Sequence, residues 1–109
     1  MKRLLDLKKY FELNRGKTIN IANKYWLDIY DGNGKDMGNF SKRYHKDGVP
    51  EYIQIVFNER TVDVYPCRKD TLNPEIINVH YKYFDINSDI DALNIVMPTE
   101  LIELIKQLK

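Results

Sequence analysis

Residues 52–66 of this chain read Tyr52-Ile53-Gln54-Ile55-Val56-Phe57-Asn58-Glu59-Arg60-Thr61-Val62-Asp63-Val64-Tyr65-Pro66. Two runs of β-branched and aromatic residues flank a short polar break, which is the pattern of an antiparallel β-hairpin. Because alternate strand residues point to opposite faces, Ile53, Ile55 and Phe57 share one face of the first strand. Val62 and Val64 share a face of the second strand in the same way. The segment therefore predicts a domain built on a meandering antiparallel sheet.

A helix is expected at each end of the chain. Between Lys2 and Asn14, leucine and phenylalanine recur at helical spacing. Arg15-Gly16 supplies the stop, because glycine readily accepts the left-handed backbone that ends helices. The segment from Leu101 to Lys109 carries a second apolar stripe. Ahead of it, Leu93 to Glu100 is expected to hold a short strand followed by Pro98, which the first helical turn tolerates.

The segment from Lys17 to Tyr30 is compatible with two structures. Its alternation and its density of aromatic and β-branched residues favour a strand. Its aromatic residues also stand at the i, i+4 spacing of a helix, however. We favour the strand because Asp31-Gly32-Asn33-Gly34 follows, and its two dipeptides are typical of hairpin reversals.

The rest of the chain alternates between polar connections and short apolar segments. A polar stretch, Lys35 to Lys46, leads into a second turn at Lys46 to Pro50. After the hairpin, Asp70 to Glu75 is expected to be a loop, and the alternation from Ile77 to Tyr83 predicts a half-exposed strand.

These elements predict a single α+β domain over residues 1–109. It consists of an antiparallel meandering sheet of about five or six strands, with an N-terminal and a C-terminal helix packed on it. The hydrophobic share of 43% and the charged share of 30% are typical of a folded domain rather than a disordered tail.

The sequence contains no metal-site or cofactor motif. Cys67 is the only cysteine, which excludes an intramolecular disulfide and a cysteine-based zinc site. A calcium loop beginning at Asp31 would need a carboxylate at its twelfth position, where Lys42 stands instead. Gly32 and Gly34 are not followed by the lysine–hydroxyl pair of a phosphate-binding loop. We therefore expect no metal and no cofactor.

We also expect that the protein is not an enzyme. The sequence alone does not place an acid where it would orient His45 or His80 as a general base. The alternative is a small enzyme in which folding brings an acid to one of these histidines.

Eight tyrosines and one tryptophan are compatible with two roles. We favour half-buried strand residues, and the alternative is a surface for a protein partner, because interfaces are rich in these side chains. The expected docking face is the one opposite the apolar face of the central hairpin, with the loop from Asp85 to Asp91 at its rim. That loop could instead hold a hard cation or cap a short turn, and we favour the turn. The candidate partner-binding residues are Tyr52, Gln54, Asp63, Tyr65, Asp85, Asp89 and Asp91.

A nucleic-acid interface is the alternative site. In the stretch from Asn39 to Lys46, cations alternate with two aromatic side chains, which combines charge neutralisation with base stacking. The protein would bind through Lys35, Lys42, Arg43, Tyr44 and Lys46. Against this alternative, 17 basic and 16 acidic residues nearly cancel, whereas dedicated nucleic-acid binders are strongly basic.

The functional hypothesis is a protein-binding module, in its concrete form a bacterial or phage inhibitor. An immunity protein that neutralises a toxin, such as a nuclease, is an example, and the acids would then mimic phosphates. The excess of Lys over Arg, with many Asn and Ile, suggests an AT-rich genome. The alternative is a nucleic-acid-binding accessory protein of a mobile element. The basic N-terminus lacks an apolar signal stretch and no long apolar run occurs, so we expect a cytoplasmic protein without a membrane segment.

Overall fold

A computed structural model describes residues 1–32, 34–42, 51–69, 76–78 and 82–109, with the backbone alone at 51, 67–69 and 76–78. Helices and strands follow one another in the order α1 (Leu4–Leu13), β1 (Thr18–Ile21), β2 (Tyr25–Ile29), β3 (Asp36–Lys42), β4 (Glu51–Phe57), β5 (Thr61–Lys69), β6 (Ile76–Asn78), β7 (Lys82–Asp85), the 3₁₀ helix η1 (Ile90–Ile95) and α2 (Thr99–Lys106).

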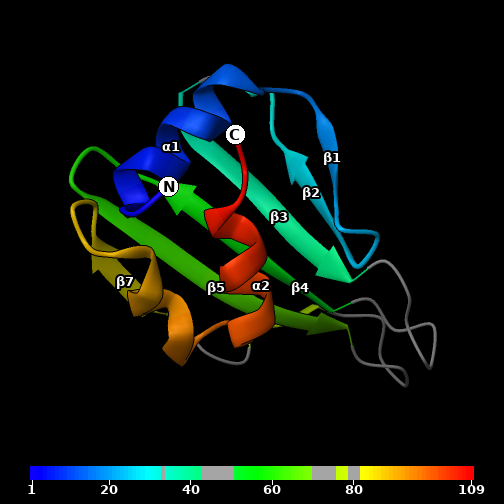
Figure 1. Cartoon of the computed structure of the whole chain (residues 1–109). Coiled ribbons are helices and arrows are strands. Elements are labelled where there is room, and N and C mark those ends of the chain that lie inside the picture. The colour runs from blue at the N-terminus through cyan, green and yellow to red at the C-terminus, as the bar shows by residue number, and fades with distance from the viewer. Residues whose placement is uncertain (33, 43–50, 70–75, 79–81) are drawn as a thin grey trace.

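The sheet is an antiparallel meander in which β1 to β5 each pair with the next strand. β6 and β7 both pair with β5, at residues 67–69 and 61–64 respectively. Since β4 occupies the other edge of β5, β6 and β7 follow one another along the same edge. The sheet is thus six strands wide, and with a helix at each end it confirms the α+β class expected from the sequence (Figure 1).

The central hairpin, β4 and β5, has the expected faces. Phe57 pairs with Val62 and Ile55 pairs with Val64, and all four side chains are buried. Ile53 is partly buried and packs against the same core. Burial of each large apolar side chain stabilises the fold by about 1.5–3 kcal/mol, so these residues hold one face of the sheet against the helices.

The segment from Lys17 to Tyr30 is a second hairpin, β1–β2, so the helix alternative is wrong. Its reversal uses positive φ angles at Ala22 (51°) and Asn23 (58°), and the Lys24 N–H donates to the Ile21 carbonyl at 3.0 Å. Asparagine visits the left-handed region more readily than most residues, but alanine does not. The turn therefore carries no Gly-containing signal that sequence reasoning could have recognised.

β3 is a central strand, although its sequence was expected only to be a polar segment. Asp36, Gly38 and Phe40 alternate on the buried side. A Cβ atom at Gly38 would lie 2.8 Å from the Phe11 ring and 2.9 Å from the Asp28 carbonyl oxygen. Glycine at this position therefore lets α1 approach the sheet closely.

The core lies between the sheet and the two helices, which cover the same face of the sheet (Figure 1). The ring of Phe11 meets the ring of Phe57 edge to face, with the centroids 5.0 Å apart and an interplanar angle of 87°. The buried residues of the helices are Leu4, Leu7, Phe11, Leu101, Ile102 and Ile105. Both expected helices are confirmed.

The strand expected between Leu93 and Met97 is wrong, because this segment belongs to η1 and the turn after it. Ile90, Leu93 and Met97 are buried, at a spacing of three and four residues, whereas Ile95 is 68% exposed. That spacing is helical and was concealed by the β-branched residues between them. Asp89 caps the element by accepting a hydrogen bond from the Asp91 N–H at 2.9 Å.

The two ends of the described chain are tied together. The Met1 amino group donates to the Lys106 carbonyl at 3.0 Å, in the last turn of α2. The Leu4 N–H donates to the Ser88 carbonyl at 2.9 Å. These bonds fasten the start of α1 to η1 and α2, so the two helices form one layer.

Candidate protein-interaction surface

The sheet has a second face, directed away from α1 and α2, which we call the outer face. Its members follow from the strand register, in which paired residues point to the same side. The described members are Thr18, Asn20, Trp26, Asp28, Met37, Asn39, Ser41, Tyr52, Gln54, Val56, Thr61, Asp63, Tyr65, Tyr83 and Asp85.

The outer face is open to solvent in the part of the chain that the structure describes. Each of its members is half-buried or exposed, whereas the residues between them in β2, β3, β4 and β5 are mostly buried. Both α-helices lie on the opposite side of the sheet (Figure 1). The outer face therefore offers its side chains on a hydrogen-bonded backbone without a covering helix among the described residues.

The structure brings four of the candidate partner-binding residues together on this face. Gln54 lies directly opposite Tyr65 on the neighbouring strand. Tyr52 precedes Gln54 by two residues, and Asp63 precedes Tyr65 by two, so both point the same way. Asp63 accepts a hydrogen bond from the side chain of Asn58 at 2.8 Å. Their common position is thus observed, while their binding role stays a prediction.

The three acids of the expected rim do not gather at one place. Asp85 lies opposite Thr61 on the outer face, and its carboxylate accepts from the Asn87 N–H at 2.8 Å. Asp89 caps η1, as described above. Asp91 forms an ion pair with Lys106 of α2 at 2.5 Å, and the hydrogen bond to Asp91 raises the pKa of Lys106. Of these acids, only Asp85 belongs to the outer face.

The acids among the described residues form no cluster of three that could hold a metal ion. His45 and His80 lie outside the described residues, as does the side chain of Cys67.

The cations of the nucleic-acid alternative are only partly described. Lys35 precedes β3 and Lys42 ends it. Seven residue steps along a strand separate them by about 23 Å. Arg43, Tyr44 and Lys46 lie outside the described residues. The structure thus places Lys35 and Lys42 at opposite ends of β3 rather than in one basic patch.

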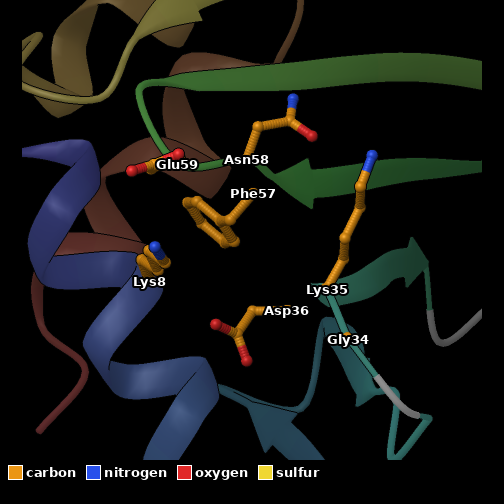
Figure 2. Close-up of a pocket in the computed structure, with 7 residues that line it drawn as sticks. All are labelled: Lys8, Gly34, Lys35, Asp36, Phe57, Asn58 and Glu59. Atoms are coloured by element: carbon orange, nitrogen blue, oxygen red, sulfur yellow. The ribbon is translucent and has the colours of Figure 1, made fainter.

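A cavity of about 300 Å³ opens beside α1, where β3 begins and β4 ends (Figure 2). In Figure 2, the ring of Phe57 lies between Lys8 of α1 and Lys35, which precedes β3. The carboxylates of Asp36 and Glu59 alternate around this ring with the ammonium groups of Lys8 and Lys35 (Figure 2). The lining residues are Lys8, Gly34, Lys35, Asp36, Phe57, Asn58 and Glu59.

Asp36 in this cavity was missed by sequence reasoning. It is only 6% exposed and is the one charged residue that is buried in the described part of the chain. Its Oδ1 accepts from Arg15 Nε at 3.0 Å and from Arg15 Nη2 at 2.6 Å. The pair joins the end of α1 to the start of β3. The alternation of Asp36 with Gly38 and Phe40 was the only sequence signal of its inward orientation.

Comparison of the chain with protein-family models, with curated proteins and with solved structures finds no match. No helix among the described residues is long and apolar enough to cross a membrane. The functional argument therefore rests on the chemistry of the outer face.

Proposed function

We propose that this protein is a non-enzymatic protein-binding module and that its partner docks on the outer face. The observation that carries the proposal is the set of four aromatic side chains on a sheet face that no described helix covers. These residues are Trp26, Tyr52, Tyr65 and Tyr83.

Aromatic side chains on a rigid sheet suit a binding surface. Tyrosine and tryptophan contribute a large contact area with few rotatable bonds, so little entropy is lost when a partner immobilises them. Tyr83 is 69% exposed, and the other three are partly accessible. A partner that covered them would remove apolar surface from water without reorganising the sheet.

The size of the face also supports a stable complex. Six strands place the outermost strands about 24 Å apart, since neighbouring strands are separated by about 4.8 Å. A standard interface uses about 20–30 residues on each side. The outer face and the turns around it supply much of that number.

In its specific form, the proposal is a cytoplasmic inhibitor that neutralises a toxin by covering its active site, as immunity proteins do. A small chain, a mixed surface charge and a composition typical of AT-rich bacterial or phage genomes support this form. A toxin gene next to the gene for this chain would support it further.

The test is a measurement of affinity for a partner purified from the native host. A partner captured with the wild-type chain is titrated by calorimetry against the variant Tyr52→Ala/Tyr65→Ala. We expect the double substitution to weaken binding by at least about 2 kcal/mol, because interface tyrosines are frequent hot spots. Circular dichroism checks that the variant remains folded.

Leu13→Ala is the matched control, since Leu13 is 81% exposed but lies on α1, on the other side of the sheet. Its affinity should equal that of the wild type. If the tyrosine variant is unfolded, Tyr83→Ala replaces it because that side chain is largely exposed. A folded tyrosine variant with unchanged affinity would contradict docking on the outer face.

A further inference from the structure

The charges on the outer face all have the same sign wherever its side chains are described. They are the carboxylates of Asp28, Asp63 and Asp85, on β2, β5 and β7. The whole chain, by contrast, has a net charge of +1. The described part of this surface therefore carries a net negative charge, whereas the charges of the chain as a whole nearly cancel.

Neutral donors bind two of these carboxylates. Asp28 accepts from the Thr18 hydroxyl at 2.6 Å, and Asp85 accepts from a backbone N–H. Asp36, Asp91, Glu100 and Glu103, which form ion pairs, lie outside the outer face. A hydrogen bond from a neutral group leaves the negative charge in place, so Asp28 and Asp85 keep an attractive field for cations.

Further hydrogen-bond acceptors lie between these acids. Asn39 stands opposite both Asp28 and Gln54 in the middle of the sheet. Three strand spacings, about 14 Å, separate the strands of Asp28 and Asp63. A partner that supplies several donors across this span would match the face.

We infer that the docking partner is a protein whose contact surface is cationic and rich in arginine. This inference rests on the proposed function and names the chemistry of the partner. A guanidinium group forms two parallel hydrogen bonds with a carboxylate and also stacks on aromatic rings. The outer face places Asp28 and Trp26 on one strand, and Asp63 and Tyr65 on another, each pair two residues apart.

Nucleic acid does not suit this face, because its phosphates would meet acids there. A toxin that binds nucleic acid, by contrast, has a surface that suits the outer face. Its own binding surface is basic, and the acids of the outer face would occupy the positions that phosphates normally take.

Trp26 provides a direct test, because it is the only tryptophan of the chain and lies on the outer face. Its fluorescence is followed during titration with a twelve-residue oligo-arginine peptide, with oligo-glutamate and single-stranded DNA as comparison probes. We expect a saturable change with oligo-arginine alone. We also expect its affinity to fall by at least tenfold between low and high salt, since exposed charges are screened.

The deciding variant is Asp28→Asn/Asp85→Asn, which keeps an oxygen that can accept the hydrogen bonds described above. It should raise the Kd for oligo-arginine by at least fivefold. The matched control is Glu12→Gln/Glu59→Gln, which removes the same charge from exposed residues outside the outer face. Its Kd should stay within twofold of that of the wild type.

Three results would overturn the inference: no fluorescence change, binding of DNA or oligo-glutamate equal to that of oligo-arginine, or equal losses in the two double variants. The native partner separates this inference from the proposed function. The function is supported and a cationic contact surface is contradicted if the tyrosine substitutions weaken binding of the native partner while salt and the aspartate substitutions leave its affinity unchanged. An affinity of the native partner that is unchanged by both the tyrosine and the aspartate substitutions contradicts both proposals.

Discussion

The inner and outer faces of the sheet are built from alternate residues of the same strands, yet they differ in burial, charge and chemistry. In β4, Ile55 and Phe57 are buried against the helices, whereas Gln54 and Val56 next to them are half-buried on the other side. The inner face holds a continuous apolar core, and the outer face displays aromatic and acidic side chains. Substitutions on the inner face should therefore affect the stability of the fold, and substitutions on the outer face should affect the proposed binding. The two kinds of substitution can be compared within one strand.

The largest expected difference in stability is between substitutions at two adjacent residues that lie on opposite faces of the sheet. Phe57→Ala should lower the free energy of unfolding by about 3–5 kcal/mol, because it leaves a cavity beneath α1. Val56→Ala should change it by less than about 1 kcal/mol. Urea denaturation followed by circular dichroism measures both values. An equal loss in both variants would mean that the outer face is covered in the folded protein.

A smaller effect is expected from β3, where α1 lies closest to the sheet. Gly38→Ala should lower the free energy of unfolding by about 1–2 kcal/mol, since the clash with Phe11 outweighs the conformational restriction that alanine adds. Ser41→Ala, on the outer face of the same strand, is the matched control and should be nearly neutral. A Gly38→Ala variant with an unchanged free energy of unfolding would show that α1 can move away from the sheet without loss of stability.

The smallest effect concerns the start of the helix layer. The Asp6 carboxylate accepts from the backbone N–H groups of Arg3 and Lys2, both at 3.0 Å, and these bonds lower its pKa. Asp6→Ala should cost about 1 kcal/mol at pH 7, a typical value for a lost N-terminal cap. Thermal unfolding as a function of pH measures the cost.

The pH dependence has a defined sign. Because the folded-state pKa of Asp6 is below its ordinary value of 3.8, its contribution is complete above pH 3.8 and is lost as the pH falls through the folded-state pKa. The difference between wild type and Asp6→Ala should therefore shrink below pH 3.8. Glu12→Ala, at the other end of α1, should show no such loss at pH 7, because an acid there is not favoured by the helix dipole. A difference for Asp6 that does not shrink as the pH falls below 3.8 would contradict the role of its charge.

The sequence predicts those parts of the fold whose signal is local. The hairpin of β4 and β5 and both helices follow from apolar periodicity that a few residues define. β3 does not, because Asp36 and Asn39 give the strand a polar composition and its central place depends on pairing with two other strands. The β1–β2 turn was missed because Ala22 adopts a conformation that alanine rarely takes.

The candidate surface was predictable to a similar extent. The common face of Tyr52 and Gln54 follows from alternation within one strand. The addition of Trp26 and Tyr83 to that face depends on the register between strands, which no short stretch of sequence specifies. The pairing of Arg15 with Asp36 joins residues 21 positions apart and likewise needs the folded chain.

The contact between Met1 and Lys106 has a practical consequence for surface-based binding measurements. Both residues belong to the helix layer, which covers the face opposite the proposed docking surface. A sensor chip that captures the protein through either end of this chain would hold it by its helix layer and present the sheet to the flowing solution. Kinetic measurements with the protein immobilised in this orientation would leave Trp26, Tyr52 and Tyr65 accessible to an analyte.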